Sequence, residues 1–259
     1  MDLDGTLFGP FGAHEGVSAE NARALVRLRE AGYEIVYASG RHHLNIARLG
    51  LGELGWLVSS QGTVARHFPT GEVVFESTLD QADVLELEAM ARERGLGAIA
   101  YHRDAVHVER VTEWTEVYAK SAGWSPVVGP FRDLPAIGFQ KVLLTTEPER
   151  VTAMHREPYF ARYHAVITEP SLLELLPPST NKATAAEAVA RRLGLTAEDA
   201  VAFGDGNNDV EMLAWAGNSY AMPHGREAAR RAARHVCPPG PPETAFARAV
   251  DHALLPSRA

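Results

Sequence analysis

Two aspartates near the start of the chain, Asp2 and Asp4, have the spacing of a pair that could perform covalent catalysis. They lie in the segment Met1-Asp2-Leu3-Asp4-Gly5-Thr6-Leu7, in which the glycine permits a turn after the second carboxylate. One carboxylate could attack phosphorus, while the other exchanges a proton with the leaving oxygen and the attacking water. A bare Asp-x-Asp pair is also typical of surface turns and of metal-binding pairs in glycosyltransferases, but the longer string Asp-x-Asp-Gly-Thr is more specific.

A second acidic segment, Phe203-Gly204-Asp205-Gly206-Asn207-Asn208-Asp209, follows an apolar stretch far along the chain. Asp205 and Asp209 could supply the hard oxygen ligands that Mg²⁺ prefers. A calcium-binding EF-hand loop is excluded, because it needs ligands at alternate positions and a terminal glutamate. The 11 histidines could indicate a transition metal instead, but most are scattered singly and there is no His-Glu-x-x-His segment.

Two further segments could hold a phosphoryl group. Ser39-Gly40-Arg41 follows an apolar stretch, and a hydroxyl with the free N–H groups of a helix start can bind phosphoryl oxygens. Lys182 stands at the start of an alanine-rich helical stretch and could neutralise phosphoryl oxygens as a point charge. Each is weak evidence alone, because small residues after strands are common and most lysines are solvated.

The composition is that of a soluble globular protein, with 46% hydrophobic and 22% charged residues among 259. This length suits one large domain or two modest ones. A net charge of −8 disfavours nucleic acid and suits a protein that binds a divalent cation with carboxylates. The sequence has neither a bilayer-spanning apolar stretch nor a signal-peptide pattern, so we expect a cytoplasmic protein. The single cysteine, Cys237, excludes an intramolecular disulfide and a cysteine-based metal cluster.

Apolar strands and amphipathic helices alternate in the first and last parts of the chain. This alternation predicts a parallel sheet covered by helices on both faces, with the polar segments at the carboxyl ends of its strands. Strands are predicted at 34–38, 56–60, 199–203 and 219–222, and helices at 18–30, after residue 41, and at 182–193, 208–216 and 226–234.

The middle of the chain has a different pattern. Residues 64–68 and 72–76 flank a Pro-Thr-Gly turn and predict a hairpin, and a long helix is expected at 81–94. Short strands at 98–101, 105–108 and 138–146 follow, with further strands near 166 and 173. We therefore predict an α/β fold with a Rossmann-like three-layer core, 1–78 and 170–259, and an inserted α+β cap domain, 79–169, that determines substrate specificity.

Together and in this order, the four polar segments resemble the haloacid dehalogenase-like hydrolase superfamily over nearly the whole chain. The insertion is similar to the cap of the Cof-like phosphatases, a group that includes sucrose-phosphate phosphatase and the mannosyl-phosphoglycerate phosphatases. The resemblance implies a Mg²⁺-dependent phosphatase that hydrolyses a small phosphorylated metabolite, above all a sugar phosphate, through an aspartyl-phosphate. We expect a small-molecule phosphate ester as partner, no nucleic acid or membrane, and a monomer or homodimer.

The resemblance also implies catalytic roles at the matching positions. Asp2 would be the nucleophile and a Mg²⁺ ligand, and Asp4 the general acid and base, with its backbone carbonyl on the metal. Lys182 and Ser39 would hold the phosphoryl group. The presence of Asp4 favours phosphate esters over halides, because the dehalogenases lack an acid at that place.

The remaining implied roles concern the metal and the phosphate. Asp205 would bind Mg²⁺ directly, and Asp209 directly or through water. Thr6, Gly40 and Asn208 would complete the phosphate-binding set.

The sequence departs from the family pattern in three places. Gln61-Gly62 stands where Asn-Gly is common, and Pro223-His224-Gly225 where Gly-Asn-Ala is common, so substrate preference is affected more than the chemistry. Only Met1 stands where the family has an apolar central strand. Because its loss would leave backbone groups of two neighbouring strands unpaired, we expect a native start a few residues upstream.

Two alternatives to the phosphatase remain open at this stage. A phosphomutase of the same superfamily would share the nucleophile but return the phosphate to its substrate. A catalytically impaired metabolite-binding protein would keep the fold without turnover. In the cap, the polar and aromatic candidates for substrate contact are His102, Trp114, Tyr118, Lys120 and Trp124.

Overall fold

The computed structural model describes residues 1–10, 16–52, 54–123 and 125–254. The chain divides into two compact units, one made of Met1–Phe75 with Asn181–Ala259, the other of Glu76–Thr180. We call them the core unit and the inserted unit. The inserted unit extends beyond the expected bounds of 79 and 169, because β10 (Leu172–Leu176) pairs antiparallel with β8 (Phe139–Thr145) and β9 (His164–Ile167).

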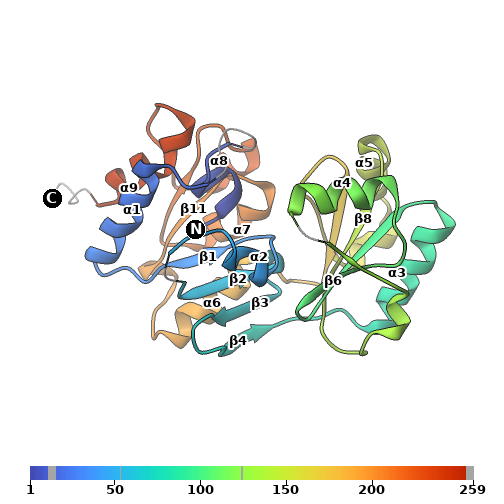
Figure 1. The fold of residues 1–259 in the computed structure, drawn as a ribbon. Helices are drawn as coiled ribbons and strands as arrows, with labels where there is room; N and C mark the ends of the chain where they lie inside the picture. Colours follow the sequence, from blue (N-terminus) through green and yellow to red (C-terminus); the bar gives the residue numbers. More distant parts are fainter. Residues whose placement is uncertain (11–15, 53, 124, 255–259) are drawn as a thin grey trace. The chain divides into compact units, whose positions relative to one another are not determined.

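The core unit contains two groups of strands (Figure 1). In the first, β1 and β2 are parallel, β2 pairs antiparallel with β3, and β4 follows β3 as the predicted hairpin. In the second, β11, β12 and β13 are all parallel. The strands span Val36–Ala38 (β1), Trp56–Ser59 (β2), Val64–His67 (β3), Val73–Glu76 (β4), Val201–Gly204 (β11), Asn218–Ala221 (β12) and His235–Val236 (β13).

The first two residues of the chain lie between these two groups of strands. The N–H of Asp2 donates to the carbonyl of Phe203 in β11 at 2.9 Å, and the N–H of Ala38 in β1 donates to the carbonyl of Met1 at 2.8 Å. Met1 and Asp2 thus occupy the central position that the family resemblance assigns to a strand. An apolar cavity of about 340 Å³ lies between β1, β11 and α6, with Met1, Val189 and Phe203 in its lining.

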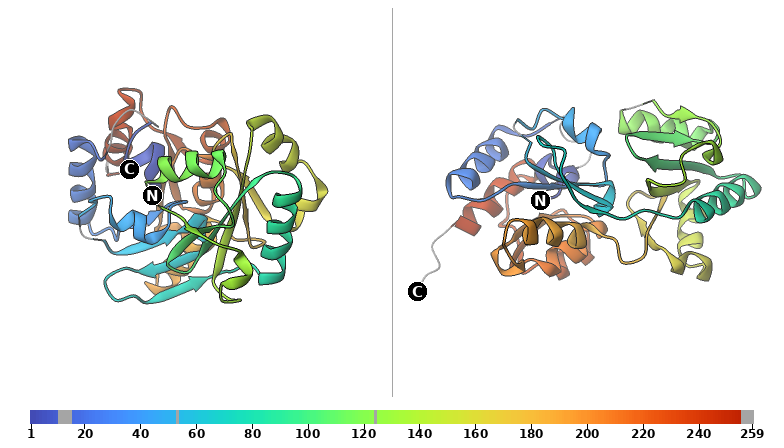
Figure 2. Two further views of the ribbon diagram at one scale, coloured as in Figure 1. Left: turned by 45° about the vertical axis from the view of Figure 1, so that its right-hand side comes forward. Right: turned by 90° about the horizontal axis from the view of Figure 1, so that it is seen from below.

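Helices cover both faces of this sheet, as predicted (Figures 1 and 2). Alternate strand residues point to opposite faces. Leu57 and Phe203 pack with α1 (Ala19–Glu30) and α9 (Ala245–Leu254). Their neighbours Val58 and Ala202 pack with the other helices, α6 (Lys182–Arg192), α7 (Val210–Trp215) and α8 (Glu227–Ala232). The short helix α2 (His43–Ala47) follows β1.

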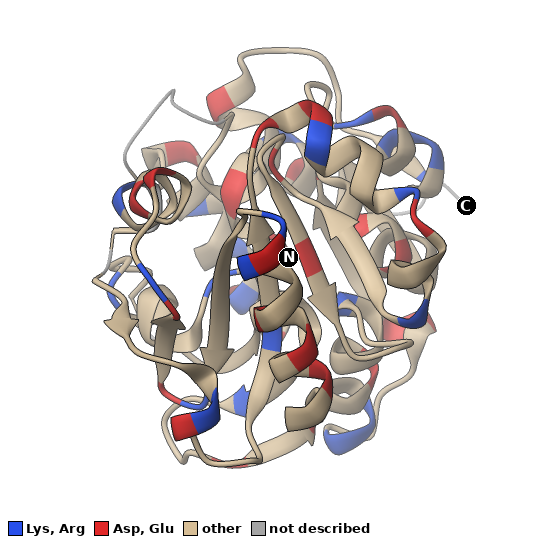
Figure 3. Ribbon diagram, turned by 90° about the vertical axis from the view of Figure 1, so that its right-hand side faces the viewer, with Lys and Arg blue, Asp and Glu red and all other residues tan. Residues whose placement is uncertain are grey.

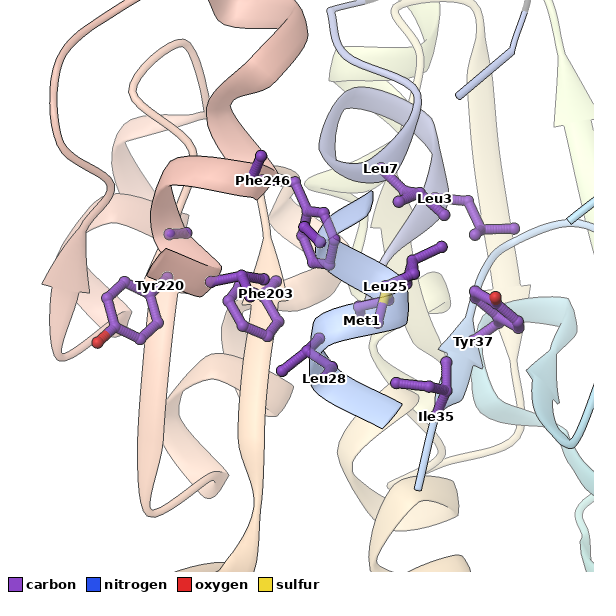
Figure 4. Packing of buried hydrophobic residues seen from close by; sticks show 14 of the residues in the cluster. Met1, Leu3, Leu7, Leu25, Leu28, Ile35, Tyr37, Phe203, Tyr220 and Phe246 are labelled. Atoms are coloured by element: carbon purple, nitrogen blue, oxygen red, sulfur yellow. The ribbon is translucent and has the colours of Figure 1, made fainter. Parts of the chain in front are cut away.

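Apolar packing fixes the turn that carries Asp2 and Asp4. Leu3 and Leu7, at the two ends of this turn, are completely buried and belong to the cluster that contains Leu25 and Phe246 (Figure 4). Because both leucines are enclosed, the polar residues between them have little freedom to move.

Asn21 connects this turn to the rest of the core unit. Its side chain is completely buried, and its Nδ2 donates to the carbonyls of Leu7 at 2.9 Å and Glu243 at 3.1 Å. Its Oδ1 accepts from the N–H of Ala247 at 3.0 Å. One amide therefore binds three backbone groups and links the N-terminal turn to the start of α9.

The inserted unit has a six-stranded sheet in the order β7-β6-β5-β8-β10-β9. Helices α3 (Gln81–Glu93) and α5 (Pro148–His155) pack on one face through a shared apolar cluster. The remaining strands are β5 (Gly97–His102), β6 (Ala105–Val108) and β7 (Val127–Val128). Helix α4 (Glu113–Ala122), which the sequence analysis did not predict, begins at the capping residue Thr112.

Charged residues of both signs occur along the helices (Figure 3). Several of them form ion pairs. Pairs three or four residues apart include Arg23 with Glu20 and Arg191 with Glu187. Inside the inserted unit, a buried pair joins Lys141 Nζ to Glu174 Oε2 at 2.6 Å. Among the described residues, no helix is both long and apolar enough to cross a membrane.

We predict that Asn21→Ala lowers the free energy of unfolding by about 3 kcal/mol, because the carbonyl of Leu7 and the N–H of Ala247 lose their hydrogen-bond partner inside the core. Chemical denaturation of the full chain measures the change. Arg23→Ala is the matched control on the same helix, since its ion pair is exposed and should contribute little. Equal stability of the two variants would contradict the bridging role of Asn21.

Candidate active site

The turn at the start of the chain separates the two aspartate side chains. Gly5 has a φ of +91°, and a Cβ atom there would lie 2.3 Å from a carboxylate oxygen of Asp205. Only glycine therefore fits this close approach without strain. The turn allows Asp2 and Asp4 to have different partners, as the sequence analysis predicted.

Lys182 links the N-terminal segment to the loop after β11. Its Nζ lies 2.6 Å from Asp2 Oδ1 and 2.7 Å from Asp209 Oδ1, and its side chain is only 1% exposed. The helix that carries it, α6, begins at Asn181, whose side chain accepts from the N–H groups of Ala183 and Thr184. This capping fixes the residue before Lys182 and so directs the ammonium group toward the carboxylates.

The loop after β11 is organised by Asp209. Its Oδ2 accepts from the backbone N–H groups of Asp205 at 3.0 Å and Gly206 at 2.8 Å. A Cβ atom at Gly204 would lie 2.6 Å from the Asp209 side chain, so the strand must end in glycine for the loop to close. Thr6 Oγ1 donates to Asp205 Oδ1 at 3.0 Å and links this loop to the N-terminal turn.

Three carboxylates meet in one small volume that fits a divalent cation. Asp2, Asp205 and Asp209 each offer a ligand oxygen, and these oxygens all lie within 4.8 Å of one another. The buried Oδ2 of Asp2 accepts no hydrogen bond from the described part of the chain. Buried polar atoms normally have a partner, and Mg²⁺ prefers oxygen ligands, so this donor set fits Mg²⁺.

Burial and mutual repulsion shift the pKa values of this cluster. Burial raises the pKa of Asp2 well above its usual value, and the nearby Asp209 adds to the shift. The same two causes raise the pKa of Asp205 to about 7. Burial acts to lower the pKa of Lys182, but Asp2 and Asp209 outweigh it, so the net shift is upward. The lysine therefore stays charged. Any further positive charge in the cluster would stabilise the ionised form of the aspartates.

Asp4 is bound by an arginine and not by the acidic cluster. Arg41 donates to both oxygens of Asp4, from Nε at 2.7 Å and from Nη2 at 2.6 Å. The backbone N–H of Arg41 donates to Ser39 Oγ at 3.1 Å, so the segment 39–41 is folded back on itself. Arg41 belongs to the Ser39-Gly40-Arg41 motif, but its role could not be predicted from the sequence, because nothing in the spacing indicates a partner 37 residues away.

The predicted phosphate-binding residues Ser39 and Gly40 follow β1, and Asn208 follows β11. Ser39 is buried, and Gly40 follows it at the end of β1. Asn208 Nδ2 donates to Gln61 Oε1 at 2.8 Å. Gln61 and His224, noted only as departures from a pattern, are thus part of the site, since His224 Nε2 donates to the carbonyl of Gly5 at 2.7 Å.

The candidate residues of the inserted unit have their own partners. His102 Nε2 lies 3.0 Å from the carbonyl oxygens of Pro135 and Ile137. The hydroxyls of Tyr118 and Tyr101 are 2.7 Å apart. Trp114 is partly buried and Lys120 is exposed on α4, while Trp124 lies outside the described residues. Their role in substrate recognition stays a prediction.

Comparison with known proteins identifies the family. A family model for haloacid dehalogenase-like hydrolases matches residues 1–243. The chain therefore belongs to the haloacid dehalogenase-like hydrolases, which confirms the resemblance carried by the four polar segments.

Individual relatives agree with this assignment. A protein of Serratia proteamaculans (strain 568) described as an HMP-PP phosphatase is 31% identical over 239 residues, which cover 86% of this chain and 82% of the relative. The crystal structure of a haloacid dehalogenase-like hydrolase from Bacteroides thetaiotaomicron is 25% identical, with a TM-score of 0.82 over 98% of this chain and 97% of that one. A structure described as the subclass IIB sugar phosphatase BT4131 is 20% identical, with a TM-score of 0.81 over 97% of this chain and 96% of that one, and shows the same fold.

We predict that Mg²⁺ binds more tightly as the pH rises from 6 to 8, because the raised pKa of Asp205, about 7, means that binding must displace a proton. Isothermal titration in buffers of different ionisation enthalpy should show release of roughly one proton per ion at pH 6 and fewer at pH 8. Asp205→Asn should weaken binding and reduce this release. Affinity that is independent of pH would contradict the shifts.

The same shift predicts how the metal-free protein responds to pH. A carboxyl whose pKa rises from 3.8 in the unfolded chain to about 7 in the folded one binds more protons when folded. The free energy of unfolding should therefore fall as the pH rises between these values, and Mg²⁺ should restore it. Thermal unfolding at pH 5 and pH 8, with and without Mg²⁺, measures this. An opposite slope that persists in Asp205→Asn would contradict the assignment.

Proposed function

We propose that this hydrolase is a Mg²⁺-dependent phosphatase that forms a phosphoenzyme on Asp2. The observation that carries the proposal is the environment of the Asp2 carboxylate. One oxygen is held by the buried Lys182, and the other is buried, accepts no hydrogen bond from the described residues, and belongs to a three-carboxylate cluster. A carboxylate fixed in this way is oriented for attack, and its surroundings carry the charges that a phosphate dianion requires.

In the first step, an oxygen of Asp2 forms a bond to phosphorus while the bond from phosphorus to the ester oxygen breaks. Asp4 gives its proton to that leaving oxygen, and the alcohol departs. Both oxygens of Asp4 accept from Arg41, so at least one of these hydrogen bonds must open when Asp4 carries the proton. Lys182 holds positive charge beside the reacting oxygens throughout.

In the second step, Asp4 takes a proton from water, whose oxygen attacks phosphorus. The bond between phosphorus and Asp2 breaks, inorganic phosphate leaves, and Asp2 and Asp4 return to their starting states. When bound by Asp2, Asp205, Asp209 and the Asp4 carbonyl, Mg²⁺ would neutralise charge between the nucleophile and the phosphoryl oxygens. Ser39, Gly40, Thr6 and Asn208 are proposed to hold the remaining oxygens.

We propose a small phosphorylated metabolite as the substrate. Two candidates have support of different kinds. The relative from Serratia is described as acting on HMP-PP at 31% identity. The resemblance to the Cof-like group favours a sugar phosphate, and the sugar phosphatase BT4131 shares the fold. The inserted unit is proposed to act as the cap that selects between such substrates.

Asp2→Asn should abolish turnover of p-nitrophenyl phosphate, because an amide neither attacks phosphorus nor bears the charge that binds Mg²⁺. We expect a loss of at least about a thousandfold, with the fold retained by circular dichroism. Glu20→Ala, on the exposed face of α1, is the control and should keep full activity. Retained turnover in Asp2→Asn would exclude the nucleophile, and wild-type protein without Mg²⁺-dependent turnover would favour the metabolite-binding alternative.

A panel of HMP-PP and sugar phosphates should identify one group with the higher kcat/KM, measured as phosphate release in the presence of Mg²⁺. The same reactions analysed for isomeric products separate the phosphatase from a phosphomutase. Free phosphate equal to the substrate consumed supports hydrolysis. Isomer formation that needs a bisphosphate activator would instead support the mutase.

A further inference from the structure

The turn after β2 has an unusual backbone. Ser60, Gln61 and Gly62 have φ values of +50°, +62° and +94° in succession. Positive φ is uncommon in residues other than glycine, and each such residue adds strain to the backbone. Two of them side by side persist only where the surrounding contacts require that conformation.

Contacts from two of the four polar segments impose this conformation. The N–H of Ser60 donates to the carbonyl of Arg41 at 2.9 Å, and the N–H of Gln61 donates to that of Ser39 at 3.1 Å. A Cβ atom at Gly62 would lie 2.1 Å from the carbonyl oxygen of Asn181, the residue before Lys182. The strained turn is therefore packed between the Ser39–Arg41 loop and the start of α6.

The side chain of Gln61 reaches a third polar segment, the loop after β11 that contains Asn208. It is 5% exposed, and its Oε1 accepts from Asn208 Nδ2 at 2.8 Å. Its Nε2 lies against Gly40, where a Cβ atom would be 2.5 Å away. The other end of the Asn208 amide lies against Gly206, where a Cβ atom would be 2.3 Å from Asn208 Oδ1. The amide of Asn208 is thus held at both ends.

The hydrogen bond from Asn208 to Gln61 fixes the direction of the remaining N–H donor of Asn208. Asn208 has two N–H donors, and Gln61 uses one of them, which leaves the second in a fixed direction. Asparagine tolerates positive φ better than glutamine does, so the backbone alone would favour asparagine at position 61. Glutamine is explained by its extra methylene group, which extends its carbonyl oxygen to Asn208.

We propose that Gln61 is a positioning residue for the phosphoryl site, which orients the side-chain amide of Asn208 and holds it beside the Ser39–Arg41 loop. This inference rests on the proposed phosphatase function, in which Asn208 contacts the transferred phosphoryl group. Gln61 itself touches no reacting atom and acts through Asn208.

Gln61→Met tests the proposal, because methionine has a similar volume and no hydrogen-bond acceptor of comparable strength. We expect kcat/KM for p-nitrophenyl phosphate to fall about tenfold, the value of one neutral hydrogen bond. In an Asn208→Ala background, the same substitution should cost less than about twofold, because its target is gone. Independent losses that multiply in the double variant would overturn the proposal.

Thr63→Val is the matched control. Thr63 is buried and its Oγ1 donates to the carbonyl of Ser60 at 3.1 Å, so this variant loses a hydrogen bond of the same turn without touching Asn208. It should lower the unfolding temperature but leave kcat/KM within about twofold of wild type. A loss of activity equal to that of Gln61→Met would show that the turn acts only through its stability.

A measurement independent of turnover separates this inference from the proposed function. The side-chain amide resonances of Asn208, assigned by their absence in Asn208→Ala, should shift in Gln61→Met and remain unchanged in Thr63→Val. If the wild-type protein shows no Mg²⁺-dependent turnover, the phosphatase proposal fails and these resonances alone decide whether Gln61 orients Asn208. Unchanged resonances in Gln61→Met would overturn the inference in either case.

Discussion

The buried ammonium group of Lys182 is the interaction on which the rest of the site depends. Three carboxylates within 4.8 Å of one another would repel strongly in a buried volume, and Lys182 compensates two of them directly. Removing water from charges is costly unless they are paired in good geometry. Lys182 at the start of α6 meets one carboxylate from the loop after β11 and one from the N-terminal segment. The folding of these three segments is therefore coupled through the ammonium group of Lys182.

The charge balance remains incomplete with one lysine among three carboxylates, and the raised pKa values of Asp2 and Asp205 express this deficit. A divalent cation and a phosphate dianion together would complete the balance. The site is therefore constructed to gain stability from binding rather than to be most stable alone, which is a common property of catalytic sites.

The turn Leu3–Leu7 places two chemically identical side chains in different environments. Asp2, just before the turn, is surrounded by Lys182 and other carboxylates, whereas Asp4, inside the turn, accepts hydrogen bonds from Nε and Nη2 of Arg41. The direction of each side chain follows from the apolar packing of Leu3 and Leu7, which fixes the ends of the turn. Different environments are what permit one aspartate to attack and the other to transfer protons.

The alternation of strands and helices, the hairpin and the four polar segments could be predicted from the sequence, because these depend on local periodicity and turn chemistry. The partners that residues find across the chain follow from the folded structure and could not be predicted from local patterns. The Arg41–Asp4 pair, the Gln61–Asn208 bond and the pairing of β10 within the inserted sheet join residues that are distant in sequence. Helix α4 was not predicted, because its sequence of short polar and aromatic runs shows no clear helical spacing of apolar residues. Local sequence patterns indicate which residues are candidates for catalysis and binding. The distances between those residues depend on how the strands and helices pack.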